Sequence, residues 1–294
     1  MTNTPSPAFV CGLAVLAPAY RALLCDVCGV VHDGARAHLP ATDALVRFRA
    51  GGGKVLLITN APRPKAGVVS LLDRLGVAPE AYDDIISSGV VATGLLAKKP
   101  GIRIFHVGPD RDLPIYDGLD LVLTGEGDCD MISCTGLFDD DNETPDDYQP
   151  SFARWHARNL PMLCVNPDIV VERGDRLVWC AGALAERYRE QGGETIVVGK
   201  PYAPIYEAAL ARLAAMAGGE IAKSSVLAVG DGIDTDVRGA AAQGIDALFV
   251  TGGIHAAVFG DRDAPDPAAV HAFLATAGLG ARALVRRLVW EDRA

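Results

Sequence analysis

Two apolar segments, far apart in the chain, each end in an aspartate with a glycine close by. Ala22-Leu23-Leu24-Cys25 runs into Asp26, with Gly29 three residues further on, and 225–229 runs into Gly230-Asp231. Near-continuous apolar runs that alternate with helical patterns are typical of strands in a parallel sheet covered on both faces. Open α/β sheets bind ligands at the carboxyl ends of their strands. The pattern therefore predicts an α/β fold with carboxylates at its ligand-binding edge.

Further predicted elements alternate at both ends of the chain. We expect strands over 54–58 and 247–250, and helices over about 43–50, 64–75, 234–243 and 268–277, the last with Asp266 as its N-cap and Pro267 as its first residue. Strand-helix alternation of this kind favours a Rossmann-like parallel-sheet core. We assign this core to residues 1–90 and 194–294.

The middle of the chain, residues 91–193, is predicted to be an inserted α/β cap domain. Its expected strands cover 103–107, 121–124 and 162–165, and its expected helices cover 152–158 and 183–190. An acidic stretch over 139–147 lies between them. It lacks the glycine at the sixth position and the glutamate at the twelfth that define a calcium-binding EF-hand loop, so a solvated loop is predicted.

Composition excludes several classes of protein. Half of the 294 residues are hydrophobic and 22% are charged, which favours a buried core over a disordered chain. The 37 aspartates and glutamates outnumber the 27 lysines and arginines, giving a net charge of −10 with no basic stripe, which argues against a nucleic-acid partner. The early apolar stretch over 8–17 is shorter than a membrane span and has no basic segment before it. We therefore expect neither a signal peptide nor a membrane partner.

The seven cysteines lack the paired C-x-x-C spacing of a structural zinc site, and we expect them to be reduced and mostly buried in a cytoplasmic protein. Cys25 and Cys28 have the spacing of a thioredoxin-like pair. That redox motif opens a helix, however, whereas Cys25 lies within a predicted strand. Redox and zinc functions are therefore not expected, and a homo-oligomer remains compatible with the sequence.

Four short motifs follow one another along the chain: Asp26-Val27-Cys28-Gly29-Val30, Thr59-Asn60, Gly199-Lys200-Pro201 and Gly230-Asp231-Gly232-Ile233-Asp234-Thr235-Asp236. Together they resemble the four motifs of the haloacid dehalogenase (HAD) superfamily. The long insert carries Ser87-Ser88-Gly89, Asn166-Pro167-Asp168 and Ala181-Gly182-Ala183, and it is similar to the nitrophenylphosphatase-like capped subgroup, class IIA. The resemblance covers about residues 10 to 255.

The resemblance implies a Mg²⁺-dependent hydrolase, specifically a phosphatase acting on a small phosphorylated metabolite such as a sugar phosphate or nucleotide. Asp26 would be the nucleophile and would form an aspartyl-phosphate. Mg²⁺ would lie between Asp26, the main-chain carbonyl of Cys28 and Asp231, because oxygen ligands suit this ion. Asp236 would hold a metal-bound water or Lys200.

The remaining motifs would bind the transferred phosphoryl group. The Thr59 hydroxyl and the amide of Asn60 would grip its oxygens, and Lys200 would stabilise charge in the transition state. In the cap, Asn166 and Asp168 are candidates for the edge that faces the substrate.

One position departs from the pattern of phosphatases in this superfamily. They carry an aspartate two residues after the nucleophile, where it protonates the leaving group and then activates water, but this chain has Cys28 there. A thiol with an ordinary pKa of about 8.5 is a poor acid for an alkoxide leaving group. The sequence thus predicts a weakened phosphatase, with His32 and Asp33 as candidate substitutes. The alternatives are a binding or regulatory protein that retains metal and phosphate binding, and chemistry other than phosphatase.

Overall fold

The computed structural model describes residues 7–173 and 176–291. The chain divides into two compact units. The first contains the described residues up to Thr59, then Ser70–Ile85 and those from Tyr206 onward, and the second contains Asn60–Val69 and Ile86–Ile205. Each unit is therefore assembled from separate stretches of chain.

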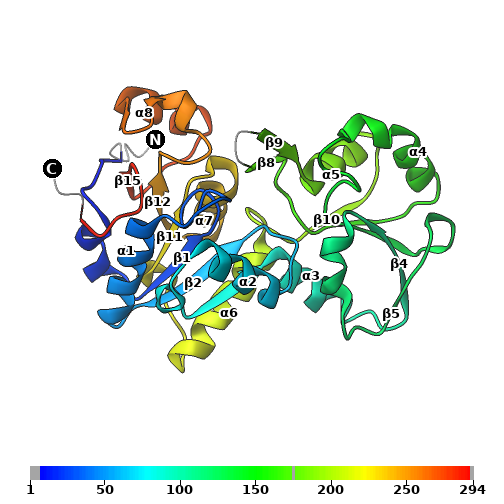
Figure 1. Cartoon of the computed structure of the whole chain (residues 1–294), viewed down its shortest axis with the longest axis horizontal. Coiled ribbons are helices and arrows are strands. Elements are labelled where there is room, and N and C mark those ends of the chain that lie inside the picture. The colour runs from blue at the N-terminus through cyan, green and yellow to red at the C-terminus, as the bar shows by residue number, and fades with distance from the viewer. Residues whose placement is uncertain (1–6, 174–175, 292–294) are drawn as a thin grey trace. The chain divides into compact units, whose positions relative to one another are not determined.

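A six-stranded sheet is the centre of the first unit. Across the sheet the strands are β15 (Ala283–Val285), β12 (Asp246–Val250), β11 (Val226–Gly230), β1 (Ala22–Asp26), β2 (Lys54–Thr59) and β3 (Asp84–Ser87). The neighbouring pairs from β15 through β2 are parallel. Every residue of β1 and β11 is buried, as expected for strands covered on both faces. The colours of Figure 1 show that both ends of the chain contribute to this sheet.

The chain changes direction across this sheet between β1 and β11. From β1 it moves outward through β2 and β3, and it later returns to β11 before moving outward on the other side through β12 and β15. Ala22 is paired with Val226 and Cys25 with Val229. In open α/β sheets such a topological switch point leaves a crevice at the carboxyl ends of the two strands, where ligands bind.

Five helices accompany this sheet along the chain: α1 (Leu39–Ala50), α2 (Lys65–Leu75), α6 (Ala203–Ala217), α7 (Arg238–Gln243) and α8 (Pro267–Thr276). A short antiparallel pair, β13 (Gly260–Asp261) and β14 (Ala264–Pro265), precedes α8. The predicted cap of α8 is confirmed, because the Asp266 side chain accepts a hydrogen bond from the Ala268 N–H at 2.9 Å.

Two helix predictions differ from the structure in detail. Helix α1 begins at Leu39 and not at Asp43, because Pro40 in its first turn has a backbone suited to a helix start. The helix predicted over 234–243 is divided into a π-helical turn, Ile233–Val237, followed by α7. That widened turn lies directly after the glycine-rich segment at the end of β11.

A second parallel sheet forms the centre of the second unit. Its strands lie in the order β10 (Thr195–Val197), β7 (Met162–Cys164), β6 (Met131–Cys134), β4 (Ile102–Val107) and β5 (Leu121–Leu123), and all neighbouring pairs are parallel. The helices are α3 (Ser88–Leu96), α4 (Gln149–Ala157) and α5 (Ala181–Glu190), and β8 (Val170–Arg173) pairs antiparallel with β9 (Arg176–Trp179). The predicted α/β fold with a second α/β unit is confirmed.

The sequence placed the start of the returning core at residue 194. In the structure β10 pairs with β7, so Thr195–Val197 complete the second sheet before the chain enters α6. The unit changes at Ile205. The division into a core domain and a cap domain with the boundaries given above stays a prediction.

The cysteines behave as small buried side chains. All seven are free thiols, and Cys25, Cys129, Cys134, Cys164 and Cys180 are buried. Burial raises the pKa of the Cys164 thiol to about 12 and that of Cys134 well above its ordinary value. The expectation that most of them are buried is confirmed, and these two thiols are poorly suited to redox chemistry.

Candidate active site

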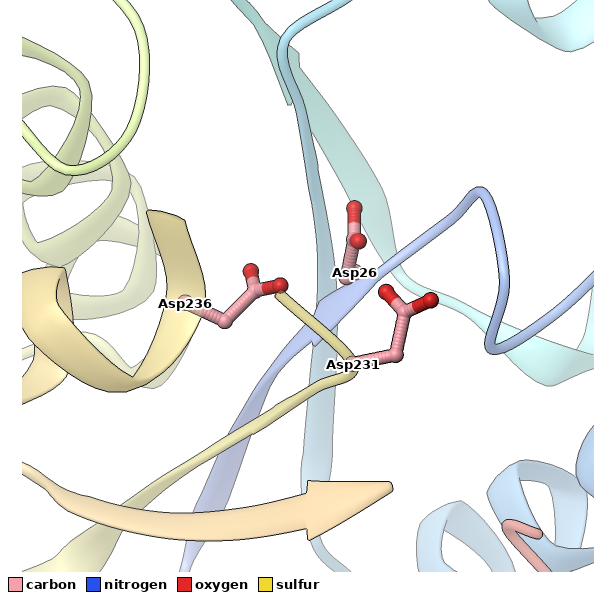
Figure 2. A group of neighbouring side chains, drawn as sticks. All are labelled: Asp26, Asp231 and Asp236. Atoms are coloured by element: carbon pink, nitrogen blue, oxygen red, sulfur yellow. The ribbon is translucent and has the colours of Figure 1, made fainter. Parts of the chain in front are cut away.

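Three carboxylates meet at the switch point of the first sheet. Asp26 is the last residue of β1, Asp231 follows β11 directly, and Asp236 lies in the π-helical turn. One oxygen from each lies within 4.8 Å of the other two, and all three side chains are buried (Figure 2). The prediction that Asp26 and Asp231 lie at one edge of the sheet is confirmed, and Asp236 lies beside them.

Backbone N–H groups hold each carboxylate in place. The Val27 N–H donates to Asp26 Oδ1 at 2.7 Å, the Ile254 N–H to Asp231 Oδ2 at 2.7 Å, and the Gly232 N–H to Asp236 Oδ2 at 3.0 Å. A carboxylate has two oxygens with about four lone-pair sites, so each can also hold a cation. Three buried carboxylates at this separation repel one another, and an oxygen-ligated divalent ion relieves that repulsion. The residues present fit Mg²⁺.

Two glycines allow this packing around Asp231. A Cβ atom at Gly29 would lie 2.0 Å from Asp231 Oδ2, and one at Gly253 would lie 1.9 Å from the same oxygen. Gly29 also has a φ of +82°, which L side chains rarely adopt. Neither position can carry a side chain unless the carboxylate moves.

In the second unit, Asn60 forms a clamp on the loop that carries Lys200. Its Oδ1 accepts a hydrogen bond from the Lys200 N–H at 2.7 Å, and its Nδ2 donates to the Lys200 carbonyl at 3.2 Å. Nδ2 also donates to Asp168 Oδ1 at 2.8 Å. Because these bonds occupy the side-chain amide, Asn60 is a positioning residue for the Lys200 loop, whose peptide bond to Pro201 is cis.

Neighbouring residues support this clamp. A Cβ atom at Gly199 would lie 2.4 Å from Ser88 Oγ and 2.5 Å from Asn60 Oδ1, so only glycine fits before Lys200. Asn166 Oδ1 accepts a hydrogen bond from the Asp168 N–H at 3.2 Å. Asn166 and Asp168 thus contribute to the clamp, and their role at the substrate-facing edge stays a prediction. Thr59, at the end of β2, is buried in the first unit.

Cys28 is half-buried in the turn after β1, and neither candidate substitute for it has a suitable pKa. Burial, the largest effect, lowers the pKa of His32 to about 4. Burial raises the pKa of Asp33, but hydrogen bonds from the Arg36 and Ala35 N–H groups and the Arg36 side chain outweigh it, and the pKa lies below its ordinary value. Neither residue is protonated for acid catalysis near neutral pH.

His255 also contributes to the site, although the sequence motifs did not indicate it. His255 Nε2 accepts a hydrogen bond from the Ile233 N–H at 3.2 Å, at the start of the turn that carries Asp236. Burial lowers the pKa of His255, although Asp234 and Asp236 oppose the shift, and this favours the neutral ring that can accept the bond. Gly252-Gly253 lies just before His255 in the sequence, but a glycine pair is equally typical of an ordinary turn.

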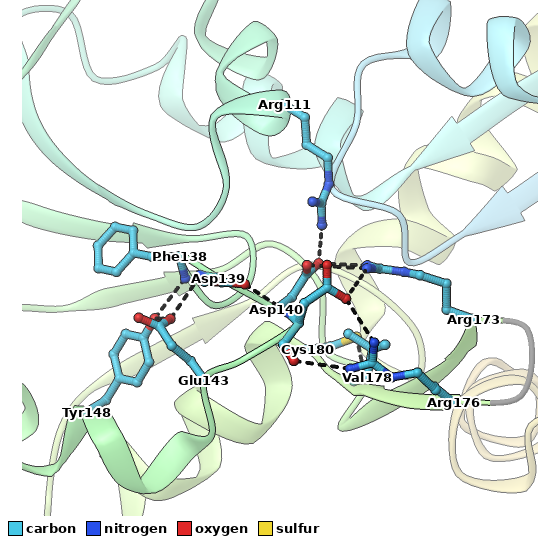
Figure 3. Close-up of polar contacts among 11 residues, drawn as sticks. Arg111, Phe138, Asp139, Asp140, Glu143, Tyr148, Arg173, Arg176, Val178 and Cys180 are labelled. Carbon is cyan, nitrogen blue, oxygen red and sulfur yellow. Dashed lines mark hydrogen bonds and ion pairs between the residues drawn. The ribbon is translucent and has the colours of Figure 1, made fainter.

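The prediction of a solvated loop over 139–147 is wrong at Asp140. This carboxylate is only 11% exposed and forms ion pairs with Arg111 and, at 2.7 Å, with Arg173 (Figure 3). Asp141 pairs with Arg173 and Arg176, each at 3.5 Å. Burial raises the pKa of Asp140, but Arg173 and Arg111 outweigh it and hold the carboxylate charged. Arginines from two separate segments therefore form ion pairs with Asp140 and cover it.

Comparisons with known proteins agree with this arrangement. A haloacid dehalogenase-like hydrolase family model matches residues 23–121, and a HAD-hydrolase-like model matches residues 197–277. The solved structure of a haloacid dehalogenase-like family hydrolase from Brucella suis 1330 is 46% identical, with a TM-score of 0.84, over 97% of this chain and all of that chain. D-glycerol 3-phosphate phosphatase from Mycobacterium tuberculosis is 30% identical over 251 residues, which are 82% of this chain and 66% of that protein. A glycerol phosphate phosphatase from M. tuberculosis, solved in complex with magnesium, is 26% identical with a TM-score of 0.64, over 81% of this chain and 70% of that one.

The fold and the carboxylate cluster define a class of protein: a hydrolase with a Rossmann-like sheet, acidic groups at its switch point and a parallel α/β cap. Two family models, one toward each end of the chain, are typical of its nitrophenylphosphatase-like members. The chain belongs to the haloacid dehalogenase-like hydrolase family, and the resemblance seen in its motifs is confirmed. Within the described residues, no helix is both long and apolar enough to cross a membrane.

Proposed function

We propose that this protein is a Mg²⁺-dependent phosphatase that hydrolyses a small phosphorylated metabolite through an aspartyl-phosphate on Asp26. The observation that carries the proposal is the buried cluster of Asp26, Asp231 and Asp236 within 4.8 Å at the switch point. The names of the relatives support the substrate class, since the M. tuberculosis protein is a glycerol phosphate phosphatase. Glycerol phosphates and sugar phosphates are therefore the first substrates to test.

In this mechanism a carboxylate oxygen of Asp26 attacks phosphorus, and the bond from phosphorus to the ester oxygen breaks. Water then attacks the aspartyl-phosphate, which releases inorganic phosphate and restores Asp26. Asp26, Asp231 and the Cys28 carbonyl would hold Mg²⁺, with Asp236 holding a metal-bound water or Lys200. Bound there, Mg²⁺ would neutralise charge on the phosphoryl oxygens.

The phosphoryl group would be bound by the Thr59 hydroxyl and by Asn60. Since the Asn60 side chain is engaged with Lys200 and Asp168, the main-chain N–H of Asn60 is the group assigned to the phosphoryl oxygens. Lys200, on the loop that Asn60 clamps, would offset negative charge in the transition state. A rigid clamp suits this role because misplacement of a charged group by about 1 Å can lower a rate by about 10².

Cys28 would limit the range of leaving groups that the protein can expel, because a thiol is a poor acid. General acid catalysis contributes roughly 10²- to 10⁴-fold, and neither His32 nor Asp33 has a pKa suited to supply it. We therefore propose that esters with good leaving groups are hydrolysed more readily than alkyl esters.

The nucleophile is tested by Asp26→Asn, with p-nitrophenyl phosphate and Mg²⁺ as the assay. The amide is nearly isosteric but not nucleophilic, so turnover should fall to background while the circular dichroism spectrum is unchanged. Asp43→Asn, which changes an exposed carboxylate on α1, is the matched control and should retain wild-type turnover. Wild-type turnover in Asp26→Asn would overturn the covalent mechanism. A wild-type protein that binds Mg²⁺ but hydrolyses no phosphate ester would instead favour the binding or regulatory alternative.

A further inference from the structure

A cavity of about 690 Å³ lies within the first unit, beside the turns that follow β1 and β12. Gly29 from the first turn and Gly252 from the second line its wall. The same turns hold the carboxylate cluster, since Gly29 and Gly253 enclose Asp231. The proposed catalytic roles do not use this cavity, although its volume lies in the range of small-molecule sites.

Positive charge predominates along the wall of this cavity. The charged residues that line it, apart from His38, are Arg36, Arg262, Arg286, Arg287, Asp33 and Asp263. Four arginines and two aspartates thus line the cavity, in a chain whose net charge is −10. A local excess of cations in an acidic protein indicates a site for an anion.

Two of these arginines each pair with one carboxylate, and Arg286 Nη1 donates to the Asp263 carbonyl at 3.0 Å. Arg287 Nη2 lies 2.6 Å from Asp263 Oδ1, and Arg36 Nε lies 3.4 Å from Asp33 Oδ2. These two arginine side chains are more than half exposed. A guanidinium has five N–H donors in a planar fork, so a single carboxylate leaves donors that match a phosphate group.

The pKa of His38 is affected by the charges around the same cavity. His38 lines the cavity, and burial lowers its pKa most strongly, while Arg287, Arg36 and Arg262 lower it further against the opposing effect of Asp33. Three arginines therefore contribute positive potential at the His38 side chain. Helix α1 begins at the next residue, and its N-terminal dipole adds to the positive potential.

The arginine cluster of the second unit is a useful contrast. There Arg111, Arg173 and Arg176 surround Asp140 and Asp141, and ion pairs join all five (Figure 3). Asp140 is enclosed at the centre, so the arginines are directed at a carboxylate of the protein itself. In the cavity of the first unit, no such central carboxylate is present among the described residues, and Arg262 has neither a hydrogen bond nor an ion pair there.

We propose that the cavity lined by Arg36, Arg262, Arg286 and Arg287 binds a small polyanion that carries phosphate groups. Planar guanidinium forks bind phosphate oxygens in pairs, which gives such a site both affinity and selectivity. The polyanion is either a separate ligand or the second phosphate group of a substrate bound at Asp26. The proposal rests on the cavity and its charges, and it stands whether or not the protein is a phosphatase.

The probe is methylenediphosphonate, whose P–C–P linkage is not hydrolysed, titrated calorimetrically at about 0.1 M salt, where the Debye length is about 10 Å, in buffer freed of divalent ions with a chelating resin. Without a divalent ion the three carboxylates repel the probe, so the heat reports binding elsewhere. The double variant Arg262→Gln, Arg287→Gln should weaken binding by about tenfold or more, because it removes charge-assisted hydrogen bonds. The matched control is Arg21→Gln, Lys223→Gln, which removes two charges next to the amino ends of β1 and β11, the opposite edge of the sheet. The control should change binding by no more than about twofold, because exposed charges beyond a Debye length are screened.

We call Arg262→Gln, Arg287→Gln the cavity variant. Three results would each overturn the proposal: equal weakening in the two double variants, unchanged binding in the cavity variant, or no binding by the wild type. Thermal unfolding of each variant shows whether it is folded. If the double variant is unfolded, Arg262→Gln alone is used, and about threefold weaker binding is expected.

A kinetic arm distinguishes the two sources of the polyanion, with p-nitrophenyl phosphate as substrate and Mg²⁺ in excess over the probe. A separate ligand leaves KM unchanged as the probe fills the cavity. A substrate whose second phosphate reaches the cavity makes the probe a competitive inhibitor, and the cavity variant then removes that inhibition. Competitive inhibition that persists in the cavity variant would place the probe at the catalytic site and count against the cavity.

Discussion

Single residues decide the chemistry at the end of β1. Asp26, Cys28 and Gly29 lie in one turn, where Asp26 belongs to the carboxylate cluster and Gly29 makes room for Asp231. Cys28 occupies the position where phosphatases of the family carry an acid. In the proposed mechanism these three residues affect nucleophilic attack, protonation of the leaving group and metal binding separately, and each can be tested alone.

Cys28→Asp should raise phosphatase turnover, most strongly for alkyl phosphates such as glycerol phosphate. An aryl leaving group departs as a stable anion, whereas an alkoxide needs a proton in the transition state. The added carboxyl group should narrow the gap between the two substrates by up to roughly 10²- to 10⁴-fold. Steady-state kinetics with both substrates measures the gap. Cys28→Ser is the control, since a hydroxyl adds no acid, and an equal gap in Cys28→Asp would show that another group already supplies the proton.

Gly253→Ala should weaken Mg²⁺ binding by about tenfold or more. The new methyl group would lie 1.9 Å from Asp231 Oδ2, so the carboxylate must move away from its partners. Metal affinity falls when the orientation of a ligand changes, typically by 10- to 100-fold. Gly280→Ala is the matched control because a Cβ atom there meets nothing within 4 Å, and isothermal titration with Mg²⁺ compares the two. Wild-type affinity in Gly253→Ala would mean that Asp231 is not a ligand.

At the scale of elements, the sequence predicted the strands whose two faces are buried. β1, β2 and β11 form apolar runs because both of their faces are covered, and the aspartates that end β1 and directly follow β11 were visible as breaks in those runs. The hairpin of β8 and β9 was missed because exposed residues interrupt its pattern. Backbone donors such as the Ile254 N–H could not be predicted, because every residue except proline has one and only the fold decides where it points.

The segment after β4 should make stability depend on pH. Burial, opposed by Arg111 and Arg63, raises the pKa of Asp112 to about 6 from an ordinary value of 3.8. The folded state thus favours the protonated carboxyl, and this contribution is complete below pH 3.8 and is lost as the pH rises through about 6. At 1.36 kcal/mol per unit the loss is about 3 kcal/mol at most.

Asp112→Asn should therefore stabilise the protein at pH 8 by up to about 3 kcal/mol and have little effect near pH 4. Urea unfolding of both proteins at the two pH values measures the difference. Asp110→Asn changes an exposed carboxylate in the same segment and should leave the pH dependence unchanged. A variant that is less stable than the wild type at pH 8 would show that the Asp112 charge is compensated in the folded state.

At the scale of the whole molecule, Mg²⁺ should stabilise the fold through a site that joins both ends of the chain. Asp26 comes from β1, and Asp231 and Asp236 come after β11, so metal binding requires the assembled sheet. A ligand that binds only the folded state adds about 2.7 kcal/mol to stability at 100 times its Kd. Differential scanning calorimetry should show an increase of several degrees in Tm on addition of Mg²⁺.

Asp231→Asn should remove that increase, while Asp43→Asn on α1 should retain it. The two substitutions each remove one carboxylate, so a general effect of charge would appear in both. If Asp231→Asn keeps the full increase, the ion binds elsewhere and the carboxylate cluster is not the metal site.

The pairing of β1 with β11 has a consequence for how the protein is made. Ala22 pairs with Val226, so β1 has no β11 to pair with until about 200 more residues have been synthesised. At 5–20 residues per second this takes roughly 10 to 40 s. During this interval one edge of β1, which is apolar up to Asp26, is unpaired, and such an edge is a template for aggregation. The residues of the second unit, up to Ile205, are all synthesised before β11 begins. Chains that end at residue 205 and have been released from the ribosome should therefore contain a protease-resistant second unit, while proteases still cleave the residues of the first unit.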